Sequence, residues 1–160
     1  GWMGHAKPFA FDLGYQPADG VERMRVGTPP VLAMAALEAS LDIWDRVDMG
    51  EVRARSLALG DLLIAEIARR CPSLRLVTPP AHAQRGSQVS FAFAGGYAAM
   101  QALIARGVIG DFRAPDIMRF GITPLYIGEA EVLKAAEIIE EVINGEVWRR
   151  QEYQVVNAVT

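Results

Sequence analysis

The chain has 160 residues, of which 51% are hydrophobic, so it can bury a substantial core but is too short for two full-sized domains. Its formal net charge is -3, and its 16 lysines and arginines are scattered, which argues against a nucleic-acid or anionic-membrane partner. A single cysteine excludes an intrachain disulfide, and no apolar run reaches the roughly 18 residues of a membrane span. These features predict a soluble cytoplasmic unit.

The first 25 residues show neither a helical nor a strand period, and they combine Pro8 and Pro17 with several aromatic residues. We expect a long ordered loop, of the kind that is often functional. A natural N-terminus is usually a loose polar tail, whereas this segment opens directly on Gly1 and Trp2 and is rich in aromatic residues. We therefore expect that the sequence begins inside a longer protein. The two histidines, His5 and His82, lack the spacing of metal ligands, so no metal site is expected.

A helix that starts at Thr28 is predicted within residues 26–48. Thr28 precedes two prolines and an apolar stripe that includes Val31, Met34 and Leu37, which is typical of a helix start. The exposed amides at such a start can bind an anion such as a phosphate, to which Thr28 could add its hydroxyl. Thr28 as an ordinary helix cap is the alternative, and the sequence leaves both open.

The rest of the chain predicts an α+β (α/β) domain in which helices pack on one face of a small, mostly antiparallel sheet. Helices are predicted over residues 50–70, 97–106 and 129–144, and strands over residues 74–78, 88–94, 108–112 and 117–120. A frayed tail is expected over residues 152–160. Residues 1–48, the loop and the first helix, are expected to stand apart from a domain over residues 49–160.

The stretch DFRAPDIMRFGITPLY, residues 111–126, places two arginines among prolines and aromatic residues. Arg119 lies between Met118 and Phe120 with little polar company, so its guanidinium needs an anion. The planar fork of arginine suits a carboxylate, which it can bind through two parallel hydrogen bonds. The anion could be a ligand or a structural aspartate or glutamate.

Other conspicuous side chains have simpler interpretations. Arg113 is expected to order its loop, and Arg85 is expected to be a surface charge in a turn before a strand. Cys71 and Trp148 are expected to be packing residues. Tyr126 follows Arg119 closely enough to border a site.

Several motifs in order resemble kynureninase. They are GWMGHAKPFAFD and RVGTPP near the start of the chain, RGSQVSF at residues 85–91, and VIGDFRAPDIMRFGITPLY at residues 108–126. They resemble the region of kynureninase that follows its cofactor lysine, and they cover nearly the whole chain. The resemblance implies the C-terminal part of a pyridoxal-phosphate enzyme of fold type I, the aspartate aminotransferase fold. Residues 49–160 would be its small domain, and residues 1–48 an active-site loop and first helix at the edge of a large domain.

The resemblance also implies roles for four residues. Trp2 resembles the tryptophan whose indole N–H contacts the cofactor phosphate, and Thr28 the hydroxyl residue that contacts the same phosphate. Arg119 resembles the arginine that binds the substrate α-carboxylate. Met3 stands where some members carry a phenylalanine that shapes the ring pocket, and with Thr28 it resembles the bacterial, kynurenine-preferring form. The Schiff-base lysine of the family lies upstream of Gly1, so no catalytic residue is expected here.

The implied activity is hydrolysis of the Cβ–Cγ bond of L-kynurenine to anthranilate and L-alanine in tryptophan degradation, with pyridoxal phosphate as electron sink. A homodimer with the active site at its interface is implied, and the chain alone is expected to be inactive because it lacks the lysine. Two alternatives remain. One is a non-catalytic dimerisation or binding module. The other is another fold-type I enzyme such as a cysteine desulfurase-like protein, which would need Cys71 to be reactive.

Overall fold

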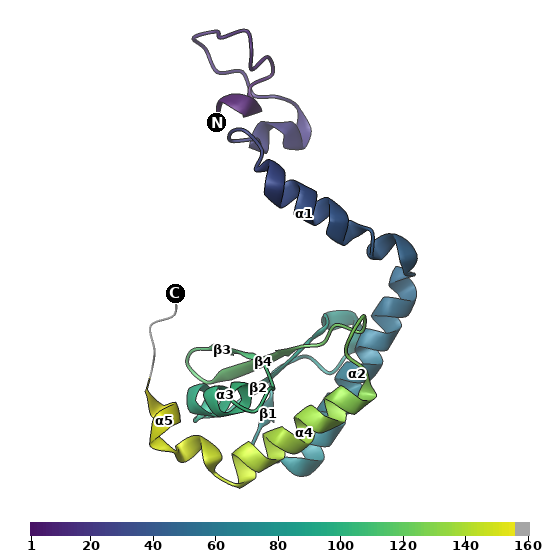
Figure 1. Cartoon of the computed structure of the whole chain (residues 1–160), viewed down its shortest axis with the longest axis vertical. Helices are drawn as coiled ribbons and strands as arrows, with labels where there is room; N and C mark the ends of the chain where they lie inside the picture. Colours follow the sequence, from purple (N-terminus) through teal and green to yellow (C-terminus); the bar gives the residue numbers. More distant parts are fainter. Residues whose placement is uncertain (156–160) are drawn as a thin grey trace. The chain divides into compact units, whose positions relative to one another are not determined.

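The computed structural model describes residues 1–155, which form two compact units that meet in sequence between Val47 and Asp48. The second unit contains a four-stranded antiparallel sheet in the order β1-β2-β4-β3 (Figure 1). The strands are β1 Arg75–Leu76, β2 Gln88–Ala92, β3 Asp111–Arg113 and β4 Ile117–Gly121. The central pair, β2 and β4, is in register from Gln88 opposite Gly121 to Ala92 opposite Ile117.

Three main helices belong to this unit: α2 Met49–Arg70, α3 Gly96–Ile104 and α4 Glu129–Asn144. Two of them begin where the sequence supplies a cap. The Asp48 carboxylate accepts the Glu51 amide N–H at 2.9 Å, and the Glu131 carboxylate accepts the Gly128 amide N–H at 2.9 Å. The short segments η4 His82–Gln84, η5 Val147–Arg149 and α5 Gln151–Gln154 complete the unit. The last part of the expected tail, residues 156–160, lies outside the described residues.

The core lies between the helices and one face of the sheet. Side chains alternate along a strand, so residues opposite one another in register share a face. Phe91 opposite Met118 and Val89 opposite Phe120 all point to the core, where they are buried against α2, α3 and α4. This confirms the predicted α+β arrangement, with helices on one face of an antiparallel sheet. By the same alternation, Arg119 points to the other face.

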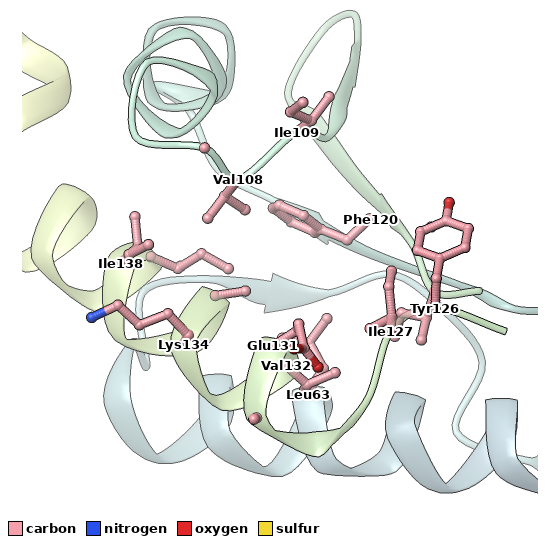
Figure 2. A pocket seen from close by; sticks show the side chains of 16 residues that line it. Leu63, Val108, Ile109, Phe120, Tyr126, Ile127, Glu131, Val132, Lys134 and Ile138 are labelled. Atoms are coloured by element: carbon pink, nitrogen blue, oxygen red, sulfur yellow. The ribbon is translucent and has the colours of Figure 1, made fainter. Parts of the chain in front are cut away.

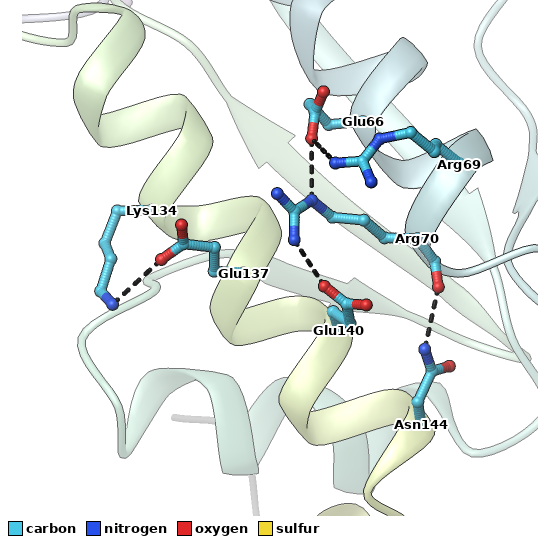
Figure 3. A network of polar contacts seen from close by, with 7 residues as sticks. All are labelled: Glu66, Arg69, Arg70, Lys134, Glu137, Glu140 and Asn144. Carbon is cyan, nitrogen blue, oxygen red and sulfur yellow. Dashed lines mark hydrogen bonds and ion pairs between the residues drawn. The ribbon is translucent and has the colours of Figure 1, made fainter.

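The C-terminal end of α2 is fastened to α4 by a polar network (Figure 3). Arg70 donates to Glu66 at 2.8 Å within α2 and to Glu140 of α4 at 2.5 Å. The Asn144 side-chain amide donates to the Arg70 carbonyl oxygen at 2.8 Å. The next residue, Cys71, is completely buried in the core, in agreement with a packing role.

Arg85 is not the surface charge that the sequence suggested. Its side chain is almost completely buried and donates to the Asp61 carboxylate of α2, which neutralises it. Asp61 also bonds His82 Nε2 at 2.8 Å, and Arg53 donates to the carbonyl oxygens of His82 and Arg85 at 2.7 and 2.8 Å. The loop before β2 is therefore held on α2 by charge-assisted hydrogen bonds. The partner of Arg85, Asp61, lies 24 residues earlier in the chain, too far for local sequence patterns to identify it.

The first unit consists of η1 Trp2–Gly4, η2 Gly20–Met24, α1 Val31–Leu41 and η3 Trp44–Arg46. The long loop is ordered by close backbone contacts. A Cβ on Gly4 would lie 2.4 Å from the Arg23 carbonyl oxygen, so only glycine fits there. The Tyr15 hydroxyl donates to the Gly4 carbonyl oxygen at 3.1 Å.

The predicted helix over residues 26–48 is shorter than expected. It begins at Val31, with Pro30 at the N-cap position and no side-chain cap bond, and it ends at Leu41. Thr28 is therefore not a helix cap, because it lies two residues before the capping position. The apolar side chains of α1, among them Val31, Met34 and Leu37, are exposed.

Candidate anion-binding site

Arg119 and Asp111 form an ion pair on the face of the sheet opposite the helices. The two residues are in register on the neighbouring strands β4 and β3, and Arg119 Nη2 donates to Asp111 Oδ2. Ser90 of β2 is in register with Arg119 on its other side. A polar row of Asp111, Arg119 and Ser90 thus crosses three strands that show only apolar side chains on their other face.

A second arginine contacts the same carboxylate. Arg113 lies two residues after Asp111 on β3, so both point to the same face, and Arg113 Nη2 is 3.4 Å from Asp111 Oδ2. The hydrogen bond from Arg119 and the positive charges of Arg113 and Arg119 lower the pKa of Asp111 below its usual value. Asp111 is therefore ionised at neutral pH, and the three side chains together carry one net positive charge.

Arg119 retains unused capacity for a hydrogen bond. Its Nε is buried and, among the residues that the structure describes, has no acceptor. A buried donor without an acceptor costs about 1–3 kcal/mol relative to a paired one. Of the two anions that the sequence left open, the structure shows a structural aspartate as the partner of Arg119. The Nε of Arg119 is a donor that a further acceptor could satisfy.

A large hollow of the second unit lies elsewhere (Figure 2). This groove, of about 700 Å³, runs between α4 and the segment before β3, with Val108, Phe120 and Ile138 among its lining residues. Phe120 follows Arg119 in the strand and points the opposite way, so Arg119 does not line the groove. Its rim charges already have partners, since Lys134 lies 3.2 Å from Glu137 and Glu131 caps α4. The groove is therefore not assigned to a charged ligand.

Three of the residues singled out by resemblance lie in the first unit. Trp2 is about half exposed and packs edge-to-face against Phe9, with 5.7 Å between ring centroids. Met3 is half-buried within η1, and Thr28 is exposed in the turn before α1. Trp2 also lines a hollow of about 350 Å³ formed by residues of the N-terminal loop.

Other candidate chemistry is sparse. Within residues 1–155, no group of histidine, cysteine, aspartate and glutamate side chains is arranged to hold a metal ion. In the same range, no helix is both long and apolar enough to cross a membrane. Tyr126 is exposed and lines the apolar groove rather than the Arg119 face. The residue that sequence reasoning missed is Asp111. The sequence feature that could have indicated this pairing is the position of Asp111 eight residues before Arg119, in a segment able to form a hairpin.

The fold is shared with solved enzymes of known type. The cysteine desulfurase CsdA from Escherichia coli matches with a TM-score of 0.66 at 21% identity, over 90% of this chain and 37% of its own. A cysteine desulfurase from Thermococcus onnurineus NA1 matches with a TM-score of 0.68 at 17% identity, over 84% of this chain and 36% of its own. These likenesses define the class by fold alone. It is the C-terminal domain architecture of fold-type I enzymes, as the resemblance implied.

Sequence similarity identifies the family within this class. The family model described as the kynureninase C-terminal domain matches residues 52–139. Kynureninases from Pseudomonas fluorescens and from Burkholderia mallei (strain SAVP1) are each 47% identical to the chain over its entire length. The chain belongs to the kynureninase family. It spans 39% of the length of these relatives.

Proposed function

We propose that the chain is the C-terminal part of a kynureninase, which hydrolyses L-kynurenine to anthranilate and L-alanine in tryptophan degradation. The observation that carries the proposal is the similarity to kynureninases at 47% identity along the whole chain. The protein would work in the cytoplasm as a homodimer with the active site at its interface. The single free cysteine, which is buried, is compatible with a reducing compartment.

Arg119 would bind the α-carboxylate of L-kynurenine. Its guanidinium has a buried Nε without an acceptor in the described residues, and the surrounding cluster carries a net positive charge. Binding the carboxylate would hold the substrate so that the bond broken at Cα has the required orientation, a contribution of positioning rather than proton transfer. Met3 would border the pocket for the aromatic ring and favour L-kynurenine over its 3-hydroxylated form.

The first unit fits a phosphate group. The Thr28 hydroxyl is exposed just before α1, whose first hydrogen bond is from the Met34 amide to the Pro30 carbonyl oxygen at 3.0 Å. The amides of Val31, Leu32 and Ala33 in the first turn of α1 have no acceptor within the helix, which is the usual setting for a bound anion. Thr28 and Trp2 would hold the phosphate of pyridoxal phosphate, which would supply an electron sink for the reaction.

We further propose that these 160 residues alone do not turn over L-kynurenine. An imine-forming lysine needs a site that lowers its pKa and excludes water. Lys134 is exposed and paired with Glu137, and Lys7 is exposed in the N-terminal loop. Neither residue is shielded from water, so the lysine would come from the part of the protein that precedes these residues.

The test is to follow anthranilate fluorescence in the protein that contains these residues, with L-kynurenine and pyridoxal phosphate. Replacing Arg119 by Gln should lower kcat/KM by roughly 100-fold or more, since it removes a charge-assisted contact, and Arg119→Lys should lose less. Arg69→Gln, an exposed arginine on α2, is the matched control. Sulfide release from cysteine without anthranilate formation would support the desulfurase alternative. Absence of both activities in the pyridoxal-phosphate-loaded protein would support the non-catalytic module.

A further inference from the structure

Arg119, Asp111 and Arg113 form a cluster in which one carboxylate lies between two guanidinium groups. We propose that Asp111 is an internal carboxylate that occupies Arg119 at rest and moves to Arg113 when the carboxylate of a ligand binds. Asp111 would then determine specificity, because it competes with every ligand for Arg119. This inference rests on the proposed role of Arg119 as a carboxylate-binding residue.

One carboxylate oxygen of Asp111 already lies near both guanidinium groups. A single oxygen, Asp111 Oδ2, accepts from Arg119 and lies 3.4 Å from Arg113 Nη2. Arg119 is the deepest of the three side chains at 28% exposure, Asp111 is intermediate at 46%, and Arg113 is outermost at 63%. Because Arg113 is more exposed than Arg119, Asp111 would move toward solvent when it leaves Arg119 for Arg113.

The charges explain why two arginines are needed. With Arg113 present, the cluster has a net charge of +1, and a bound carboxylate would bring it to zero. Without Arg113, the ligand and Asp111 would be two carboxylates sharing one guanidinium, an arrangement that like-charge repulsion disfavours. Arg113 therefore compensates the charge of the displaced Asp111, and ligand binding depends on an arginine that does not touch the ligand.

Without a ligand, the Asp111–Arg119 ion pair stabilises the guanidinium of Arg119. A partly buried guanidinium without a counter-ion would be poorly solvated, and Asp111 supplies that counter-ion while leaving Nε unpaired. A ligand with a full negative charge can replace Asp111, whereas a neutral amide cannot compensate the loss of this ion pair. The cluster should accordingly reject the carboxamide counterpart of a carboxylate ligand.

The experiment is an NMR titration of the 160-residue chain, labelled with ¹⁵N, with acetate, L-alanine or acetamide as the probe. Asp111→Asn should bind acetate roughly three- to tenfold more tightly, because it removes the competing charge, and Arg113→Gln should bind it more weakly by a similar factor. In the double variant, the effect of Arg113→Gln should shrink markedly, because no displaced carboxylate remains to be compensated. In the unmodified chain, acetate should shift the Arg113 side-chain signals as well as those of Arg119, and acetamide should shift neither.

The controls separate this inference from the role of Arg119. Glu137→Gln removes a carboxylate elsewhere on the surface and should leave acetate affinity unchanged. Arg119→Gln should abolish binding; retained binding would show that Arg119 is not the carboxylate site. If Arg119→Gln abolishes binding but Asp111→Asn weakens it or leaves it unchanged, Arg119 keeps its role and the exchange is wrong. If Asp111→Asn does not fold, the Arg113→Gln variant tests the exchange by itself. An acetate affinity of Arg113→Gln equal to that of the unmodified chain would contradict the exchange.

Discussion

Asp111 and Arg119 face each other in register across β3 and β4, on the side of the sheet that points away from the hydrophobic core. The pair arises because Phe120 and Met118, the neighbours of Arg119, both point into the core. Strand alternation then leaves Arg119 no orientation except the opposite face, where β3 brings a carboxylate beside it. Core packing on one face of the sheet thus positions the charged cluster on the other.

The stability of the chain should fall in acid because of its paired aspartates. Hydrogen bonds from arginine lower the pKa of Asp61 and of Asp111 in the folded state. A carboxyl group whose pKa is lower in the folded state stabilises the fold at pH values above its unfolded-state pKa, which is about 3.9 for aspartate. This stabilisation is lost as the pH falls through the folded-state pKa. Urea denaturation between about pH 6 and pH 2.5 should therefore show a declining free energy of unfolding below about pH 4.

The variant Asp61→Asn/Asp111→Asn should be less stable at neutral pH and should lose less stability on acidification. Asp45→Asn, an exposed position in the first unit, is the control and should follow the unmodified chain. A double variant whose acid decline is as steep as that of the unmodified chain would show that other carboxylates carry the effect.

The position of β3 depends on a glycine. A Cβ on Gly110 would lie 2.8 Å from the Arg119 carbonyl oxygen and 2.7 Å from Met100 Cε, so Gly110→Ala should push β3 away from β4. We expect the free energy of unfolding to fall by about 1–3 kcal/mol, as for other overpacked sites. Gly121→Ala on β4 has open space around its Cβ and is the matched control. Equal free energies of unfolding in the two variants, measured by chemical denaturation, would contradict this role for Gly110.

Helices in which capping signals and apolar periodicity agree lie where the sequence predicted them. The helix predicted over residues 129–144 is α4 with the same bounds, and the one predicted over residues 50–70 differs from α2 by one residue. Both have a broad apolar face and a capping carboxylate near the start. By contrast, the helix predicted to start at Thr28 begins only at Val31, because the chain passes through two prolines before the first helical turn.

The partners of charged residues were beyond the reach of the sequence. The need of Arg119 for an anion followed from its apolar neighbours, but the identity of Asp111 depends on the register of β3, which begins three residues later than predicted. Arg85 was misjudged for the same reason, since its partner Asp61 lies on a distant helix. Local patterns indicate that a charge requires a partner, whereas only the tertiary structure identifies it.

The contact between α4 and the rest of the core should be sensitive to truncation at its centre. Ile139 is completely buried in the core cluster, so Ile139→Ala should lower the free energy of unfolding by about 2–5 kcal/mol. Leu133→Ala on the same helix removes a half-exposed side chain and should cost less than about 1 kcal/mol. Chemical denaturation measures both. Similar losses in the two variants would mean that α4 packs through a different face.

Cys71 should be unreactive in the folded chain. Its side chain is completely buried, and burial raises the pKa of its thiol to about 11. Because the thiolate is the reacting species, almost none is present at neutral pH, and the surrounding core excludes the reagent. Iodoacetamide at pH 7 should therefore label the native chain very slowly, and urea should raise the rate by orders of magnitude, toward that of a free thiol.

Mass spectrometry of samples taken over time gives both rates, and a short cysteine-containing peptide provides the reference for free-thiol reactivity. The dependence on urea should follow the unfolding curve measured by circular dichroism, since exposure of Cys71 requires α2 to separate from the core. Rapid native labelling would instead indicate a low-pKa, accessible thiol. That result would remove the main structural argument against chemistry of the cysteine desulfurase type in this chain.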